Sequence, residues 1–565
     1  MSLFSTIQQS SNALSVAQLG LSVAGNNVSN ANTPGYIRQE LQQSSAAGYR
    51  LGGVILGGGV RATGVVQKID NFLTERLRQT GSDLATSQTL TDAYNHIEAS
   101  FAELGSNDLS SQLASFSSSI QDVLNQPGND ALRRLVVERG KTLADQVRSL
   151  HTDMSSLSDG LNQQIKNSAT EINRLTTNIA ELNQRIVQME GGGSRGSDAV
   201  GLRDERVQAL NELASIVSIR AVEQASGSVT VFVGGEYLVS DRTQRLVTPA
   251  LGQDGDKSKL EIHLADTDSP IQITGGRLKG LYEARDVATA NAIDGLDDFA
   301  RNIIGQFNRI HTQGQGLEGY SSTSGTTATD DRSAPLDLAG YSSPISNGSF
   351  ELVVHDLESG QDKTASIRVQ LTGGTSDSSL EDIRDQITAV SGVTASITPD
   401  GKLSIVSNNQ RLRFTFQNDN SGFLAAAGVN TFFDGNSAST IRVNDQIAGN
   451  PRLLAASLSG VGGGTENAVQ LARAFDQPVA QLNGQSVTQN YEGMIVRITQ
   501  DINTQQGTTD GLKNFYKTLE SQNLATSGVN LDEEAIRMIF YQRAFQASSR
   551  VIKASNEMLD TLVNL

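Results

Sequence analysis

The first segment of the chain carries a seven-residue repeat of apolar residues and no charge. Between Met1 and Ile37 there is no Asp, Glu, Lys or Arg, and Arg38 is the first charged residue. Such a repeat is typical of a coiled-coil helix, here roughly 40 Å long at about 1.5 Å per residue. Its apolar residues fall on two seams, one with Ile7, Leu14, Leu21 and Val28, the other with Leu3, Ala17 and Ala24.

A run of asparagines ends this predicted helix. Asparagine lowers helix propensity, and the Pro-Gly pair that follows stops the helix. We therefore expect the chain to leave the helix as an extended arm. The residues of this stretch are Asn26, Asn27, Asn30, Asn32, Pro34, Gly35 and Tyr36.

The last segment mirrors the first. Asn530 is the expected N-cap of a helix roughly 50 Å long, and Asp532, Glu533 and Glu534 follow near its positive end. Neither terminal helix has much core of its own on which to pack. We therefore expect the two to pack on each other and then on neighbouring subunits. The apolar residues that repeat every seven positions are Leu531, Met538, Phe545, Ile552 and Leu559.

A third heptad pattern predicts a long helix inside the chain. From Leu143 to Met189 the apolar residues step by four and three, which indicates a continuous helix of roughly 70 Å. An extra step of four between Leu161 and Ile165 is a stutter, which locally unwinds a supercoil. A shorter amphipathic helix follows in residues 201–217.

The remaining sequence alternates between β-rich and helical stretches. Asp400-Gly401 is a hairpin signal, and we expect residues 321–331 to form a loop or linker. These patterns predict an α+β multi-domain chain, with terminal coiled-coil helices and a long helical bundle domain that carries inserted β-rich domains. The expected parts are an N-terminal axial helix (1–45), a long-helix domain (46–218), a β-rich hairpin region (219–275), a returning helical segment of the long-helix domain (276–320), a distal β-rich domain (345–445), a helical return (460–525) and a C-terminal axial helix (526–565).

Composition excludes several classes of function. The net charge of -17 and the pI of about 4.8 disfavour nucleic acid and anionic membranes as partners. No stretch reaches the roughly 20 apolar residues of a membrane helix, and the N-terminus lacks the cationic start of a secretory signal. The chain has no cysteine, its five histidines are isolated, and no nucleophile or metal motif occurs. We therefore expect no catalytic site, metal or cofactor.

Both ends of the chain resemble the motifs of flagellar axial proteins, which comprise rod, hook and hook-associated subunits. The N-terminal stretch is NNVSNANTPGYIRQ, and the C-terminal stretch is SGVNLDEEAIRMIFYQRAFQASSRVIKASNEMLDTL. Between Thr33 and Gln39 the turn contains Pro34, unlike the Thr-Gly-Phe-Lys-like turn of rod and hook proteins, so it is similar to the hook-associated members. Three internal stretches agree with this resemblance, namely LRDERVQALNELASIVSIR, GGRLKGLYEARD and SGFLAAAGVNTFF.

The resemblance implies a structural role at the junction of hook and filament. Such subunits are synthesised in the cytoplasm, exported unfolded by the flagellum-specific type III apparatus and assembled on the extracellular flagellum. Their terminal segments fold on assembly. The implied partners are other copies in a ring, the hook protein, a second hook–filament junction protein, and an export chaperone on the C-terminal helix. We expect the assembly interface to comprise Leu3, Ile7, Leu14, Leu21, Val28, Leu531, Met538, Phe545, Ile552 and Leu559.

Other interpretations stay open on sequence grounds. The interface residues could instead form ordinary intramolecular core. Within the flagellar class, a hook or rod subunit is disfavoured by Pro34 and by the long internal helix. A secreted coiled-coil adhesin would require surface anchors or cysteine staples, and a peptidoglycan hydrolase would require a paired acid site, and neither pattern is found.

Overall fold

Two compact units make up the chain, each assembled from separated segments. The computed structural model describes residues 3–33, 35–51, 54–101, 108–191, 199–254, 257–374 and 376–563. The first unit contains residues 1–92, 159–286 and 503–565, and the second contains residues 93–158 and 287–502. Both combine helices with small antiparallel sheets, so the prediction of an α+β chain is confirmed.

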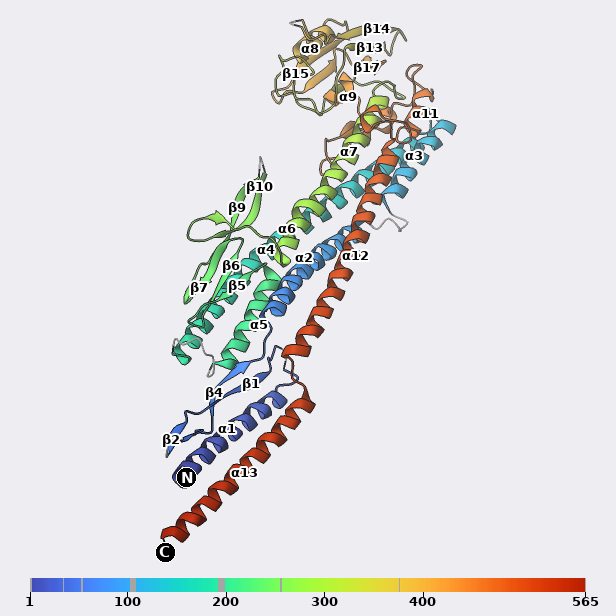
Figure 1. Cartoon of the computed structure of the whole chain (residues 1–565). Helices are drawn as coiled ribbons and strands as arrows, with labels where there is room; N and C mark the ends of the chain where they lie inside the picture. Colours follow the sequence, from blue (N-terminus) through green and yellow to red (C-terminus); the bar gives the residue numbers. More distant parts are fainter. Residues whose placement is uncertain are drawn as a thin grey trace. The chain divides into compact units, whose positions relative to one another are not determined.

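In the first unit, the two terminal helices lie side by side (Figure 1). Helix α1 (Leu3–Ser29) and helix α13 (Leu531–Val563) follow the two predicted heptad segments. A Cβ atom added at Gly20 of α1 would stand only 2.5 Å from the Tyr541 ring of α13. Because that distance is sterically forbidden, a residue without a side chain is required for the two helices to approach this closely.

The arm after α1 forms strands, whereas the sequence indicated only an extended course. Strand β1 (Gln39–Ser45) pairs antiparallel with β4 (Val60–Gln67). Strand β2 (Tyr49–Leu51) pairs with β3 (Val54–Leu56). The sequence of β1, QELQQSS, is almost entirely polar. It therefore lacks the alternation of apolar and polar residues by which a strand is recognised.

Three long helices contribute residues to both units. They are α2 (Asn71–Phe101), α4 (Asp130–Met189) and α12 (Val487–Ser527). Helix α4 confirms the predicted continuous helix and begins earlier than the repeat that indicated it. In the first unit its large buried apolar residues are Leu161, Ile165, Ile172, Leu175, Ile179, Leu182 and Ile186.

The β-rich part of the first unit contains two antiparallel sheets. Helices α5 (Val200–Ile216) and α6 (Arg277–Glu283) precede and follow them in the chain. One sheet has the order β5-β6-β7-β8, and the other has the order β11-β10-β9. The strands are β5 (Arg220–Glu223), β6 (Val229–Val233), β7 (Glu236–Ser240), β8 (Thr243–Gln244), β9 (Val247–Asp254), β10 (Lys257–Leu264) and β11 (Ser269–Pro270).

An aromatic cluster forms the helical core of the second unit. The Phe116 ring of α3 lies 5.2 Å from the Phe307 ring of α7, 5.5 Å from Phe432 and 6.1 Å from Phe475, measured between centroids. Aromatic rings at these separations add to the stability from area burial. The elements of this helical part are α3 (Leu109–Asn125), α7 (Ala290–His311), β18 (Phe433–Asp434), β19 (Arg442–Val443), α10 (Asp445–Gly449) and α11 (Glu466–Ala472). A π-helical turn (Ala284–Thr289) precedes α7 in the chain.

The distal β-rich part of the second unit contains two three-stranded sheets, with orders β14-β13-β17 and β12-β16-β15. Gly401 takes a positive φ of 76° in the turn between β15 and β16, which confirms the predicted hairpin. The elements are β12 (Ser322–Ser324), β13 (Gly348–Asp356), β14 (Asp362–Val369), α8 (Leu380–Thr388), β15 (Val393–Ile397), β16 (Leu403–Ser407), β17 (Leu412–Gln417) and α9 (Phe423–Ala427).

One local prediction in this part of the chain is wrong. Residues 321–331 do not form only a loop, because Ser322–Ser324 pairs with β16. The segment has the Ser/Thr-rich composition of a linker, but hydrogen bonds to the edge of an existing sheet need no apolar side chains.

The described residues offer no membrane span and no metal centre. None of the described helices is long and apolar enough to cross a membrane. No group of three or more His, Asp or Glu side chains in the described ranges is placed to hold a metal ion. His311 is fully buried, and its two ring nitrogens bond to backbone atoms of Asn430 and Ala455. Its role is therefore structural.

Candidate assembly site at the chain termini

Asn27 connects the end of α1 to the arm and to α13. Its side-chain oxygen accepts hydrogen bonds from the Gln39 backbone N–H at 3.0 Å and from the Tyr36 hydroxyl at 2.8 Å. Its amide nitrogen donates to the Gln39 carbonyl at 2.9 Å and to the Glu534 carboxylate at 3.1 Å. Asn27 is fully buried, so all four bonds that its side chain can make are used within the chain.

Arg38, the first charged residue of the sequence, binds the beginning of α13. Its guanidinium lies 2.7 Å from carboxylate oxygens of both Glu533 and Glu534. The side chains of Arg38 and Glu534 are 4% and 1% exposed, whereas that of Glu533 is 55% exposed. Burial lowers the pKa of Arg38, but the hydrogen bonds to the two carboxylates outweigh this effect and raise it overall.

We call Asn27, Tyr36, Arg38, Glu533 and Glu534 the terminal latch. The acidic residues lie in the first turn of α13, where the helix dipole favours negative charge. The Asn530 side chain accepts the Asp532 backbone N–H at 3.0 Å, which confirms the predicted N-cap. The latch therefore joins the two ends of the chain through a capped helix terminus.

The other residues of the N-terminal motif shape the turn before the arm. Asn30 donates its side-chain amide to the Asn26 side-chain oxygen at 2.8 Å, and Asn32 is exposed. Gly35 adopts a φ of 78°, a left-handed conformation that favours glycine. Pro34 lies outside the described residues.

The predicted interface residues of the terminal helices are only partly covered within the chain. Val28, Leu531 and Phe545 are 38%, 54% and 37% exposed. The side chains that pack most deeply in α1 are instead those of Val16, Ala17, Val23 and Ala24. The predicted residues that are half-buried are Leu3, Ile7, Leu14, Leu21, Met538, Ile552 and Leu559.

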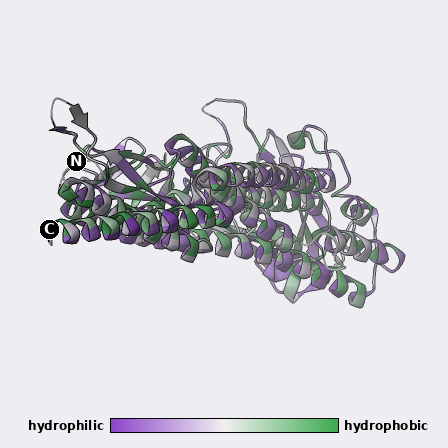
Figure 2. Ribbon diagram, turned by 60° about the horizontal axis from the view of Figure 1, so that its bottom comes forward, coloured by the Kyte–Doolittle hydropathy of each residue, from purple (hydrophilic) through white to green (hydrophobic). Residues whose placement is uncertain are grey.

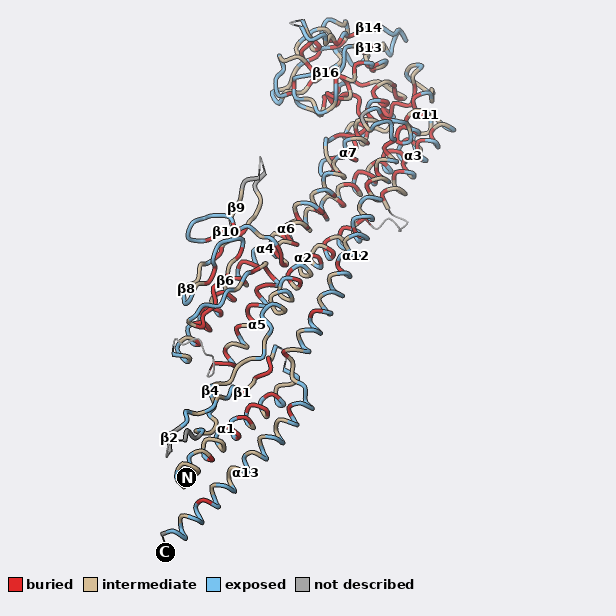
Figure 3. Tube along the Cα trace, viewed as in Figure 1, coloured by how far each residue is buried: buried red, intermediate tan, exposed pale blue. Residues whose placement is uncertain are grey.

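Helix α13 also carries a second apolar stripe, which the sequence analysis missed. Figures 2 and 3 show apolar residues on a helix that is largely exposed. The same spacing of three and four could have found this stripe beside the first one. Its members, between 42% and 67% exposed, are Ile536, Ile539, Phe540, Val551, Met558 and Leu562.

Asp204 of α5 ties the arm to the helical part of the first unit. Its carboxylate accepts a hydrogen bond from the Gln67 side chain of β4 at 2.5 Å. Burial raises the pKa of Asp204 to about 6, although hydrogen bonds from Gln67 and from the Ile37 backbone lower it. Burial likewise raises the pKa of Tyr36 to about 12, with contributions from the charges of Asp204 and Glu534.

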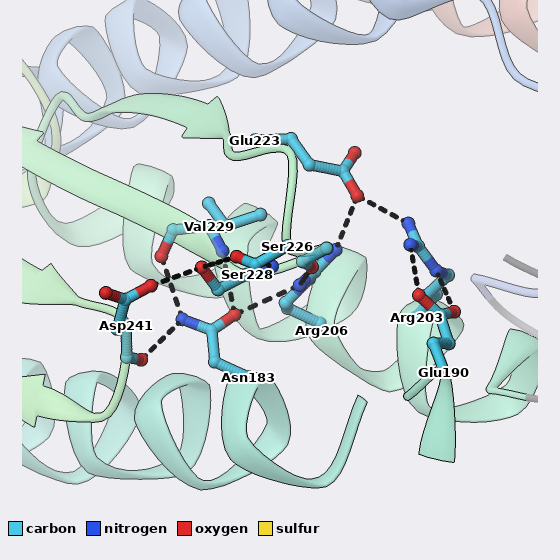
Figure 4. Close-up of polar contacts among 10 residues, drawn as sticks. Asn183, Glu190, Arg203, Arg206, Glu223, Ser226, Ser228, Val229 and Asp241 are labelled. Atoms are coloured by element: carbon cyan, nitrogen blue, oxygen red, sulfur yellow. Dashed lines mark hydrogen bonds and ion pairs between the residues drawn. The ribbon is translucent and has the colours of Figure 1, made fainter. Parts of the chain in front are cut away.

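The arginines on either side of Asp204 bind the β-rich part of the first unit (Figure 4). Arg203 forms two hydrogen bonds with Glu190, of 2.8 and 2.9 Å, and one of 2.6 Å with Glu223 of β5. Arg206 donates to the Asn183 side chain at 3.0 Å and to the Gly227 carbonyl at 2.7 Å. Burial lowers the pKa of Arg206 to about 10.

Asn183 completes this cluster by bonding to the strand itself. Its amide nitrogen donates to the carbonyls of Val229 and Asp241, and its oxygen accepts the Val229 backbone N–H at 3.0 Å. The stretch LRDER therefore contacts two different parts of the first unit. Asp204 holds the arm, and the two arginines hold the hairpin against α4 and α5.

Four protein-family models match separate parts of the chain. The flagellar hook-associated protein FlgK helical domain matches residues 94–326. The flagella basal body rod protein model matches residues 7–36, and the flagellar basal body rod FlgEFG protein C-terminal model matches residues 520–565. The flagellin hook IN motif matches residues 357–409. The two terminal motifs and the middle of the chain thus all have flagellar counterparts.

Curated relatives extend the similarity along the whole chain. Flagellar hook-associated protein 1 of Salmonella typhimurium is 25% identical over 99% of this chain and 100% of that protein. Flagellar hook-associated protein 1 of Bacillus subtilis is 24% identical over 100% of this chain and 98% of that protein. The resemblance seen in the terminal motifs is thus confirmed by relatives that match along the whole chain, and these relatives are hook-associated proteins.

A solved structure supports the shared fold. The flagellar hook junction protein FlgK from Burkholderia pseudomallei, 15% identical, covers 80% of this chain and 100% of that chain with a TM-score of 0.50.

Replacing Glu534 should open the terminal latch, whereas replacing its neighbour should not. Glu534→Gln leaves the buried Arg38 without its buried partner, which should cost about 3 kcal/mol in the opening free energy of α1 and α13. Glu533→Gln removes an exposed carboxylate and should change little. Amide hydrogen exchange along both helices measures the difference, and equal effects of the two substitutions would contradict the latch.

The docking of the arm should weaken as pH rises from about 4 to about 6. The pKa of Asp204 is about 6 in the folded chain, whereas the unfolded chain releases this proton near the ordinary pKa of 3.8. The contribution of Asp204 to the free energy of unfolding is therefore greatest below about pH 4 and falls as the pH rises. Asp204→Asn keeps an acceptor for Gln67 and should remove this pH dependence from the exchange of β1 and β4. Glu181→Gln, at an exposed residue of α4, serves as the control, and an unchanged pH profile in Asp204→Asn would refute the assignment.

Proposed function

We propose that this chain, a hook-associated structural protein of the bacterial flagellum, forms the ring that joins the hook to the filament. It polymerises through its terminal helices. The observation that carries the proposal is the α1–α13 pair, which the terminal latch joins and which keeps apolar side chains exposed along its length.

The exposed side chains of this pair favour burial against other subunits. Each large apolar side chain that leaves water contributes roughly 1.5–3 kcal/mol when fully buried. Phe4, Phe540 and Leu562 are 74%, 66% and 65% exposed. Copies arranged in a ring would cover such residues together with the ten predicted interface residues. Isolated helices of this composition are marginal in water, so the terminal segments would gain order on assembly.

The absence of charge in α1 suits this location. An unpaired charge buried in the wall of a tube costs several kcal/mol, whereas an uncharged helix carries no such cost. Arg38 lies just beyond α1 and is neutralised within the chain by Glu533 and Glu534. The N-terminal segment can thus be enclosed without leaving a charge unpaired.

The proposed partners follow from the same location. They are further copies of the chain, the hook protein on one side, a second hook–filament junction protein on the other, and an export chaperone that grips α13 before secretion. The chain is synthesised in the cytoplasm, exported unfolded and located on the extracellular flagellum. We assign it no catalytic activity.

Cells that lack this gene provide the test. Electron microscopy should show complete hooks without filaments, and monomeric flagellin should accumulate in the medium. Absent hooks would instead indicate a hook or rod subunit. Normal flagella would contradict a structural role at the junction.

A charge placed on the exposed apolar face of α13 should block assembly without unfolding the chain. Phe545→Asp introduces a carboxylate where the ring would bury an aromatic side chain, so complemented cells should lose most of their filaments. Gln546→Asp places the same carboxylate on the neighbouring exposed residue and should preserve filaments. Electron microscopy counts the filaments, and thermal unfolding checks the purified variants. Loss of stability in Phe545→Asp would favour an intramolecular core role for Phe545.

A further inference from the structure

Strand β14 forms one edge of the distal sheet β14-β13-β17 (Figure 1). In an antiparallel ladder every second residue directs its backbone N–H and C=O away from the partner strand. The Arg368 backbone N–H bonds outside the sheet, to the Gln386 side chain. By the same alternation, Ser366 and Thr364 also direct their backbone groups outward from β14.

The chain covers part of this edge with side chains. The Gln386 side chain of α8 accepts the Arg368 N–H at 2.8 Å and donates to the Arg368 carbonyl at 3.0 Å. Thr388 makes the equivalent pair with the Ala395 N–H and carbonyl of β15, both at 3.2 Å. These side chains replace the backbone of a missing neighbouring strand, one of the means by which proteins protect sheet edges.

The protection stops before Thr364 and Ser366. Within the described part of the chain, their outward backbone groups have no hydrogen-bond partner, and both side chains are exposed. A cavity of about 380 Å³ lies beside them, lined by residues 363–367 of β14 together with Gln386, Ala389, Val390 and Ser391. The open edge and the small side chains after α8 therefore leave room for one more extended strand.

The charges along this edge indicate what kind of strand fits. Lys363 and Arg368 lie at the two ends of the open stretch, and among the described residues neither has a carboxylate within 4.0 Å. The adjacent acid, Asp362, is already bonded to His355 at 2.6 Å. A strand with acidic residues near both of its ends would complement the two free cations.

We propose that the edge of β14 binds an extended segment of a partner protein by strand addition, and that this segment carries acidic residues at both ends of the bonded stretch. Thr364 and Ser366 each offer one donor and one acceptor, and a small apolar side chain of the segment packs on Ala389 and Val390. Backbone bonds then supply affinity, while the charges and the apolar contact supply specificity. None of its residues belongs to the terminal latch or to the ten predicted interface residues.

Selection of linear peptides from a phage-displayed library on the immobilised whole chain tests this site. Peptides enriched on the wild type should carry Asp or Glu at both ends of an alternating stretch. Ser366→Pro removes the outward N–H, which the fold does not use, and proline is tolerated at such edge positions. It should weaken binding of a synthetic selected peptide about tenfold or more, whereas Ser366→Ala keeps the N–H and should leave binding unchanged. Equal binding by the two variants, or no enriched peptide, would overturn the proposal.

A charge-reversed variant tests the chemistry of the partner separately. Lys363→Glu combined with Arg368→Glu should change the selected peptides from acidic to basic ends. Urea unfolding of each variant checks that the distal sheets are intact. Selection of the same acidic peptides by the charge-reversed chain would refute the assigned complementarity.

Discussion

The arrangement of the chain ends depends on a buried ion pair between Arg38 and Glu534. A buried charge is tolerated only when its partner is held against it by additional hydrogen bonds. Here Asn27 of α1 supplies such a bond to the Glu534 carboxylate, and the exposed Glu533 adds a contact to Arg38 that water screens. Because each group has few low-energy positions, the pair fixes the arm after α1 against the first turn of α13. The pair thereby also fixes how α1 is aligned along α13, and this alignment places Gly20 against the Tyr541 ring.

This arrangement divides the terminal helices into an inner and an outer surface. Small residues of α1 lie inside together with Asn27, Arg38 and Glu534 of the latch, whose polar groups are bonded within the chain. Large apolar side chains remain outside, on both α1 and α13. The described part of one subunit leaves them exposed, which supports the proposal that further copies cover them. Asp204 and its neighbouring arginines connect α5 to the arm that follows α1 and to the hairpin sheet of the first unit.

Much of the helical framework was predictable, because helices are encoded by local periodicity. The repeats located α1, α4 and α13, and the residues after Asn530 indicated the cap of α13. Strand β1 was not predictable, because its pairing with β4 does not depend on apolar alternation. The latch was hidden for another reason: Arg38 and Glu534 are 496 residues apart. The partners of LRDER were not predictable either, because only the fold brings Glu190, Glu223 and Asn183 to its arginines.

The central claim is that Arg38 and Glu534 act as one buried unit on which the packing of the chain ends depends. A double-mutant cycle with Arg38→Met, Glu534→Gln and the combined variant tests it most directly. The opening free energy of α1 and α13, measured by amide hydrogen exchange of the whole chain, is the readout. Each single variant loses opening free energy relative to the wild type. The account predicts that the double variant loses about 2 kcal/mol less than the sum of the two single losses. Losses that add independently would contradict it.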